Sequence, residues 1–358
     1  GPVFLLFILL LSACGGSSSG SGGSSNDDPS NVLSGTAAAG AAIIGQVTVK
    51  GALGNTTSAL IEADGSYEVD VTGLTAPFRL RAQGTVGGRT VKLFSYAEAA
   101  DVGGTVNITP FTDLIIANAA QQIAEEFFDS TSTVELDPSV VEAQEAALQA
   151  KLQNVFDALG VSSAIDLLNT SFSADSSGLD AALDIVRVEI DPDSNIATIT
   201  NLVENTTISD NVLDTTDNAE TLDVDESSNL TTSAANTQAI VAIFNALSAG
   251  FENGLPTGTS IQDYFSEDFL DEETQKSQWL SEITTDPTVI GLTFNSVSIS
   301  DLDTVEGTAT VTFNTALNGI VDPEPVVWFA AKIDDNWQLR GDQRIVETYF
   351  NFHCNDND

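Results

Sequence analysis

The sequence predicts a multidomain protein with an N-terminal all-β sandwich, a central helical region that contains a β-hairpin, and a C-terminal α+β roll. Three observations predict this organisation. Apolar and polar side chains alternate with a period of two over residues 34–109, the spacing becomes helical over 110–201, and residues 237–344 begin with helical and end with strand periodicity. The length of 358 residues accommodates two or three domains.

An apolar run over residues 3–11 opens the chain and ends in Leu11-Ser12-Ala13-Cys14. The run is too short to span a bilayer as a helix, but it has the length of a signal-peptide core. The quartet resembles the lipobox of bacterial lipoproteins, and this resemblance implies cleavage before Cys14 and lipid attachment to it. We therefore expect residues 1–14 to be a lipoprotein signal segment; a short buried strand beside a linker is the alternative.

Residues 15–33 are expected to form a flexible tether, because Gly and Ser alone fill positions 15 to 25 and cannot bury apolar area. The predicted protein is exported and held at the cell envelope by its lipid, and Gly15 after the cysteine favours the outer membrane. The chain starts at Gly1-Pro2 without an initiator Met. We expect the natural sequence to extend beyond this start and beyond the tail at 345–358.

Charge is distributed unevenly along the chain. Eleven Lys and Arg against 52 Asp and Glu give a net charge of −41. Residues 34–110 carry five basic and six acidic residues, whereas residues 111–358 carry six basic and 44 acidic residues, a balance of −38. Such a surface repels nucleic acid, which we exclude as a partner. Because the acids are scattered, they favour a solvated, salt-adapted surface over Ca²⁺ sites, which are the alternative.

The rarity of Cys and His restricts the chemistry. Only Cys14 and Cys354 occur, so lipidation of the first leaves Cys354 as a free thiol or paired with sequence beyond it. The single histidine, His353, lies in the same tail and is badly placed for a Ser-His-Asp triad. The sequence has no His-rich zinc motif and no Gly-rich phosphate loop, and we expect no metal or cofactor.

Short strands separated by turns build the predicted sandwich. The alternating segments are Val47–Val49, Tyr67–Val71, Phe78–Ala82 and Val91–Leu93. Asp64-Gly65 suits a tight hairpin turn, because Gly accepts a positive φ without a Cβ clash.

Three motifs in this region carry a family resemblance. Gly45-Gln46-Val47, Ala63-Asp64-Gly65-Ser66-Tyr67 and Phe78-Arg79-Leu80 resemble a carboxypeptidase regulatory-like domain, which is a transthyretin-like (Ig-like) sandwich. The resemblance covers residues 34–109 and implies a non-catalytic module of an exported protein. No peptidase zinc motif accompanies it, which removes the case for proteolysis.

Two long helices and a short one are expected in the central region. Thr109 as N-cap and Pro110 at the first helical position begin the first helix, whose apolar stripe extends from Leu114 to Phe127. The second is expected over Pro138–Leu159, with Gly160 as its C-cap, and the short helix near 179–183.

A hairpin with strands 185–190 and 196–199 follows. The spacing of Asp191, Asp193 and Asn195 in its turn is that of the start of an EF-hand calcium loop. The Gly and Glu that such a loop requires at its sixth and twelfth positions are missing, which favours a polar hairpin turn.

Residues 202–236 are rich in Asp, Asn, Thr and Ser and are expected to be an acidic linker. Beyond it, Gln238–Gly250, Tyr264–Phe269 and Trp328–Arg344 resemble a nuclear transport factor 2-like, or cystatin-like, roll over residues 237–344.

Periodicity predicts how this roll packs. A helix over 237–251 has one apolar stripe and should cross the concave face of a bent sheet. A phase slip at Asn295-Ser296 predicts a β-bulge. Residues 326–331 are continuously apolar and are expected to form a central strand buried on both faces.

Rolls of this family enclose a cone that binds a small ligand or catalyses isomerisation or hydrolysis. Tyr264 with Asp263 or Asp268 is the one pair that resembles such a catalytic site, and a wall or surface position for Tyr264 is the alternative. Arg340-Gly341-Asp342 spells an integrin-binding tripeptide, which we interpret as coincidence.

Two functions remain open at this point. The first is a non-catalytic, membrane-anchored lipoprotein that presents binding or structural modules to a protein, glycan or small-molecule ligand. The second is an enzyme or small-ligand binder that uses the cone of the roll. The first explains the anchor, the tether and the single histidine, whereas the second rests on the fold resemblance alone.

Overall fold

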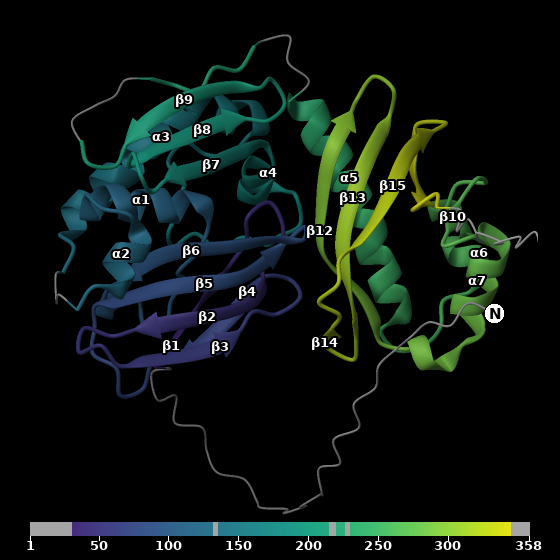
Figure 1. Ribbon diagram of the computed structural model, residues 1–358, viewed down its shortest axis with the longest axis horizontal. Coiled ribbons are helices and arrows are strands. Elements are labelled where there is room, and N and C mark those ends of the chain that lie inside the picture. Colours follow the sequence, from purple (N-terminus) through teal and green to yellow (C-terminus); the bar gives the residue numbers. More distant parts are fainter. Residues whose placement is uncertain (1–30, 132–134, 215–219, 226–229, 345–358) are drawn as a thin grey trace, which may run out of the picture. The chain divides into compact units, whose positions relative to one another are not determined.

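The computed structural model describes residues 31–131, 135–214, 220–225 and 230–344. Cys14, His353 and Cys354 lie outside the described residues. Those that are described form five antiparallel β-sheets and a set of helices (Figure 1), which confirms a multidomain, β-rich organisation. Three separate hydrophobic cores hold these elements.

The first core lies between two small sheets. One pairs β1 with β4, and the other has the strand order β3-β2-β5-β6. The strands are β1 (Val32–Thr36), β2 (Ile44–Lys50), β3 (Thr56–Leu60), β4 (Ser66–Asp70), β5 (Phe78–Val86) and β6 (Arg89–Ala97), and the 3₁₀ turn η1 (Ala99–Asp101) follows. The predicted turn is confirmed, because Gly65 has φ +85° and Asp64 Oδ1 accepts from Ser66 N at 2.9 Å.

The second core belongs to the central region. Its helices are α1 (Pro110–Ala120), α2 (Ala124–Asp129), α3 (Pro138–Leu159) and α4 (Gly178–Ile185). The first predicted helix is divided into α1 and α2, because Gln121 adopts a left-handed conformation with φ +51°. The predicted caps are confirmed: Thr112 N donates to Thr109 Oγ1 at 3.2 Å while Thr109 N donates to Thr112 Oγ1 at 2.9 Å, and Gly160 ends α3 with φ +69°.

The expected linker over residues 202–236 contains regular structure instead. The hairpin of β7 (Val186–Asp191) and β8 (Ile196–Asn201) gains a third strand, β9 (Thr206–Asn211), which pairs with β8. The one fully buried position of β9 is Asp210, a charged residue, so the strand carries no apolar alternation that the sequence could display. Helix α5 also begins earlier than predicted, at Leu230.

The third core belongs to the C-terminal region. The sheet has the order β12-β13-β15-β16, with β14 paired to β13. The helical elements are α5 (Leu230–Phe251), α6 (Gly258–Ile261), η2 (Gln262–Tyr264), α7 (Lys276–Thr285) and η3 (Pro287–Val289). The strands are β10 (Leu270–Asp271), β11 (Thr274–Gln275), β12 (Leu292–Asp303), β13 (Thr308–Leu317), β14 (Ile320–Val321), β15 (Val326–Ile333) and β16 (Asn336–Gly341).

Helix α5 packs on one face of this sheet, as predicted (Figure 1). Its Phe244 is fully buried, with ring centroids 4.8 Å from Phe313 and 5.9 Å from Phe294. The predicted bulge is confirmed by a register shift that begins at Asn295 and by the φ of +52° at Ser296.

The prediction for strand β15 is half right. The strand is central, between β13 and β16. It is not buried on both faces, however, because Trp328 and Ala330 point into the core while Val327 and Phe329 remain exposed. Helix α5 covers only one side of the sheet, so the apolar run reflects one buried and one open face.

Candidate functional site

Aromatic side chains fill the space that a ligand cone would occupy between α5 and the sheet. Phe313 and Trp328 have ring centroids 5.0 Å apart, and Trp328 is 5.5 Å from Phe269. A second group of contacts joins Phe265 to Trp279 at 4.8 Å. This packing stabilises the C-terminal core through apolar burial and ring contacts.

The residues nominated from the sequence lie at the edge of this core. Tyr264 ends the short helix η2 and is half-buried, whereas Asp263 and Asp268 are exposed. Both carboxylates border a polar hollow of ≈ 680 Å³, and Tyr264 does not line it. The structure therefore brings the two aspartates to one hollow and leaves the predicted tyrosine outside it.

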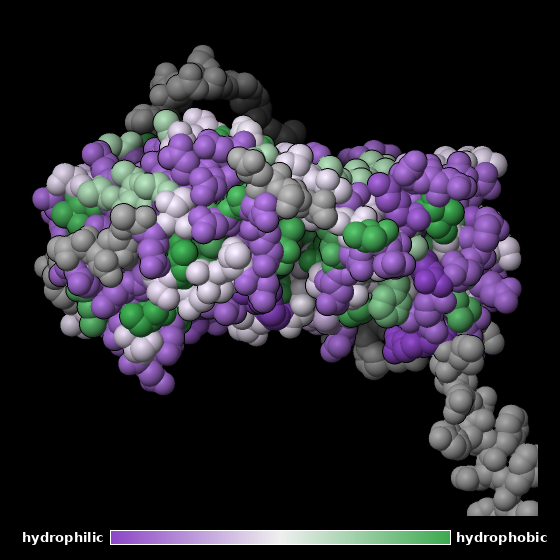
Figure 2. Space-filling view, turned by 90° about the horizontal axis from the view of Figure 1, so that it is seen from above, coloured by the Kyte–Doolittle hydropathy of each residue, from purple (hydrophilic) through white to green (hydrophobic). Residues whose placement is uncertain are grey.

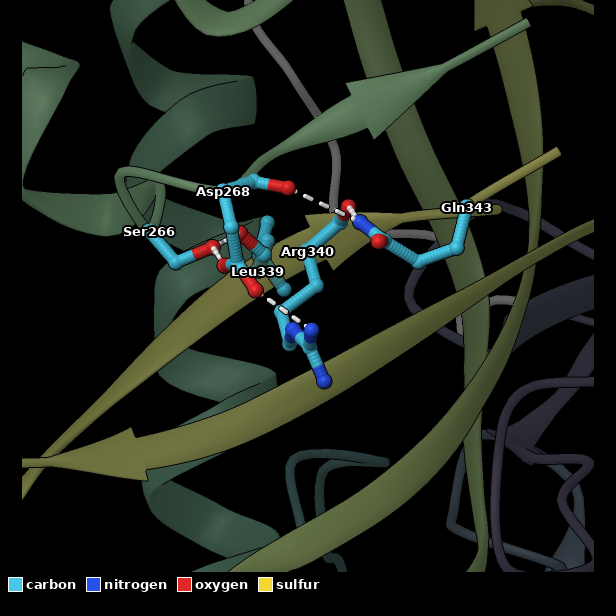
Figure 3. Close-up of polar contacts among 5 residues, drawn as sticks. All are labelled: Ser266, Asp268, Leu339, Arg340 and Gln343. Atoms are coloured by element: carbon cyan, nitrogen blue, oxygen red, sulfur yellow. Dashed lines mark hydrogen bonds and ion pairs between the residues drawn. The ribbon is translucent and has the colours of Figure 1, made fainter. Parts of the chain in front are cut away.

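Asp268 is held in a network that Figure 3 shows in detail. Its Oδ1 accepts from the buried Ser266 hydroxyl at 2.6 Å, its Oδ2 forms an ion pair with Arg340, and its backbone oxygen accepts from Gln343 Nε2 at 3.0 Å. The Ser266 hydrogen bond and the Arg340 charge hold the pKa of Asp268 below its usual range, although partial burial opposes them.

An aspartate with a lowered pKa stays ionised near neutral pH and is a poor general acid or base there. The contacts of Asp268 instead connect the turn before β10 to strand β16. Asp268 pairs with Arg340 on that strand, and its partner Ser266 donates from Oγ to Leu339 O at 3.2 Å. The hollow adds a second ion pair, between Lys276 and Glu267 at 2.6 Å. The arrangement suits the binding of a polar ligand better than acid–base catalysis.

The tripeptide Arg340-Gly341-Asp342 is built into the end of β16 rather than displayed. Gly341 has φ +75°, and a Cβ at this position would lie 2.2 Å from Leu270 O. Asp342 is 8% exposed, and its Oδ1 accepts from the backbone N–H groups of Glu272 and Arg344. These contacts agree with its interpretation as coincidence.

The turn between β7 and β8 is a polar hairpin turn, as predicted. Asp191 Oδ1 accepts from Asp193 N at 2.9 Å, Oδ2 accepts from Ser194 Oγ at 2.8 Å, and Asn195 has φ +58°. Within the described ranges, no group of three or more His, Cys, Asp or Glu side chains is placed to hold a metal ion.

A pair of aspartates on α4, one buried and one partly buried, was not predicted from the sequence. Asp180 is 1% exposed, and its Oδ2 accepts from Ser176 N at 2.7 Å. Its Oδ1 has no hydrogen-bond partner in the described part of the chain. Asp184, one helical turn on, also has a buried Oδ2 that finds no partner among these described residues. Gly40 packs beside it, since a Cβ there would lie 3.2 Å from Asp184 Oδ1.

Burial and mutual repulsion set the protonation of this pair. Burial raises the pKa of Asp180 to about 7 and raises that of Asp184 well above its ordinary value, and the negative charge of Asp180 raises the pKa of Asp184 further. The sequence signal was present in Gly-Leu-Asp-Ala-Ala-Leu-Asp-Ile, where two Asp four residues apart occupy an otherwise apolar helix.

Comparison with known proteins adds no assignment to this geometry. No protein-family model, curated protein or solved structure was found to match the chain. In the described part of the chain, none of the helices combines the length and the apolar character needed to cross a bilayer.

Proposed function

We propose that this chain is a non-catalytic lipoprotein of the bacterial cell envelope, anchored through Cys14, that presents folded modules for binding. The observation that carries the proposal is the order of segments: an apolar core, a lipobox-like quartet, a Gly/Ser segment, and then a compact unit that starts at Asn31. Each segment has the property that an exported, tethered protein requires.

The finer identities of the modules belong to this proposal. Two antiparallel sheets around one core support a transthyretin-like sandwich of the carboxypeptidase regulatory-like kind over residues 34–109. A helix packed on one face of a bulged antiparallel sheet supports a nuclear transport factor 2-like roll over residues 237–344. The aromatic filling of the roll favours display or binding at the surface over catalysis in a cone.

Detergent phase partitioning of the protein expressed with its signal segment in a bacterium tests the anchor. Wild type should partition into the detergent phase and label with a radioactive fatty acid. Cys14→Ser should lose the label and retain its signal segment. The matched control is Cys354→Ser, which should partition as wild type does. A wild-type protein that remains wholly in the aqueous phase would overturn the proposal.

The polar hollow beside Asp268 supports a second candidate, the binding of a hydroxylated small ligand such as a glycan. Amide, carboxylate and ammonium groups meet there, among them Gln262, Glu267 and Lys276. NMR titration with soluble oligosaccharides should shift the signals of these residues before others. Shifts confined to other surfaces, or none at all, would remove this candidate.

A further inference from the structure

Three polar side chains meet inside the central core. Asn118 lies on α1, Lys151 on α3 and Asp210 on β9, and their exposed fractions are 6%, 3% and 5%. The apolar residues of the same core include Leu148, Leu152 and Val155, which flank Lys151 in sequence on α3. Such burial is rare for a lysine, because removing an ammonium group from water is costly.

One carboxylate faces both of the other groups. Asp210 Oδ2 accepts from Asn118 Nδ2 at 2.9 Å, and Oδ1 lies 3.8 Å from Lys151 Nζ. Among the residues that the structure describes, neither Lys151 Nζ nor Asn118 Oδ1 has a hydrogen-bond partner. A buried ammonium carries three donors, so this arrangement leaves both a charge and an amide oxygen incompletely satisfied.

We propose that Lys151 and Asn118 become joined by an intramolecular amide bond, with Asp210 as the proton carrier. The Asp210 carboxylate takes a proton from the Lys151 ammonium, and the neutral amine attacks Asn118 Cγ. A new Nζ–Cγ bond forms and the Cγ–Nδ2 bond breaks. The proton held by Asp210 passes to the departing nitrogen as the Cγ–Nδ2 bond breaks. Asp210 then takes the second proton that Nζ loses on becoming an amide nitrogen and passes it to the released ammonia, which leaves as ammonium while Asp210 returns to its ionised form.

The reaction suits this place in the fold for two reasons. The shared carboxylate already holds the amide nitrogen that must leave, and the flexible four-carbon stem of the lysine lets Nζ swing from Oδ1 toward Cγ. The surrounding apolar core also excludes the water that would compete for the protons.

The product would be a covalent cross-link in a part of the chain that has no disulfide. Cys14 and Cys354 are the only cysteines of the sequence, so no disulfide lies within residues 31–344. An amide between Asn118 and Lys151 would tie α1 to α3 and restrict the unfolded chain much as a disulfide does. It would also replace an incompletely paired buried charge with a neutral amide.

Intact mass spectrometry of the wild-type protein under denaturing conditions tests the proposal without any mutation. The expected mass is that of the processed sequence less one molecule of ammonia. Proteolytic digestion should then release a branched peptide that contains both Asn118 and Lys151. A mass equal to the processed sequence would overturn the proposal, and a loss of water with a Lys151–Asp210 branch would overturn the assignment to Asn118.

Variants separate the roles of the three residues. Asp210→Asn keeps the shape of the site and should leave the chain at its unlinked mass, because the proton carrier is gone. Asn118→Asp should lose water in place of ammonia, which identifies the leaving group. The matched control is Lys92→Met, a change at a lysine on β6 that pairs with Glu125, and it should still lose ammonia. Loss of ammonia from Lys151→Met would contradict the mechanism.

Discussion

The guanidinium of Arg79 lies 4.4 Å from the ring centroid of Phe127 and donates to the carbonyl oxygen of the same residue at 2.7 Å. Lys50 and Arg81 repeat the pattern beside it, with Lys50 Nζ donating to Phe128 O at 2.8 Å and Arg81 lying 4.7 Å from the Phe128 ring. Three cations from β2 and β5 thus meet the C-terminal end of α2, where a helix favours positive charge.

Replacing Arg79 with Ala should lower the free energy of unfolding by about 2–4 kcal/mol, because buried carbonyl oxygens on α2 lose their donor and the ring loses its cation. The free energy of unfolding of Arg79→Lys should lie between those of wild type and Arg79→Ala, since a lysine keeps the charge but not the planar guanidinium group. Urea denaturation followed by fluorescence measures the stability of wild type and of both variants. The exposed Arg89→Ala is the control, and an effect equal to that of Arg79→Ala would contradict the assigned role.

Salt should stabilise the protein. Residues 111–358 carry a charge of −38, and hydrophilic residues predominate on the face shown in Figure 2. Near 1 M salt the Debye length falls to ~3 Å, which screens the mutual repulsion of the acids. The melting temperature should therefore rise between low and near-molar NaCl. A flat curve would count against salt adaptation, and a rise with CaCl₂ but not with NaCl at matched ionic strength would favour Ca²⁺ sites.

The Asp180–Asp184 pair should make stability depend on pH. The pKa of Asp180 rises from 3.8 to about 7 on folding, so the folded protein binds more protons than the unfolded chain between these values. The associated stability is fully present below pH 3.8 and is lost as the pH rises to about 7, with a total on the order of a few kcal/mol.

Asp180→Asn imitates the protonated side chain and should flatten this part of the pH profile. The variant should match wild type near pH 4 and exceed its free energy of unfolding at pH 8, as measured by urea denaturation across the pH range. The exposed hairpin residue Asp193 supplies the control, because Asp193→Asn should leave the slope unchanged. A variant whose slope equals that of wild type would show that Asp180 does not titrate as described.

Local structural features were predictable from the sequence where a residue type strongly favours one position, such as a helix cap or a β-bulge. The Thr109 cap, the Gly160 C-cap and the bulge at Asn295-Ser296 follow from such preferences and are confirmed. The burial of Asp210 in β9 was not predictable, because its partners Asn118 and Lys151 lie far away in the sequence. Asp180 differs, because its position in the apolar helix α4 is visible in the sequence and its partner Ser176 is local.

The candidate site was likewise predictable from the sequence only in its local part. Asp263 and Asp268 were nominated as alternative partners of Tyr264; both aspartates border one hollow, whereas Tyr264 does not line it. The contacts of Asp268 with Arg340 and Gln343 were not foreseen, because they join segments more than 70 residues apart. Sequence periodicity reports which face of an element is apolar and carries no information about such distant polar contacts.

The last prediction concerns the buried ring of Phe244, which contacts Phe294, Phe313 and Trp328 from helix α5. Phe244→Asp places a charge in this core and should cost about 4 kcal/mol or more. The C-terminal core shares no residue with the core of residues 33–108. The C-terminal region should therefore unfold while the N-terminal sheets β1–β6 stay folded. Hydrogen exchange resolved by peptide would show the loss of protection in β12, β13 and β15.

Helix α5 contributes to two cores. Its first residue, Leu230, belongs to the central core, whereas Phe244 and Phe251 belong to the C-terminal core. Some loss of protection should therefore reach the N-terminal turns of α5 and stop before β1–β6. The control is Phe329→Asp, on the open face of β15, which should leave exchange nearly unchanged. Full protection of β12, β13 and β15 in Phe244→Asp would refute the packing of α5 on the sheet. Simultaneous exchange of β2 and β5 would show that the N-terminal and C-terminal regions unfold as one unit.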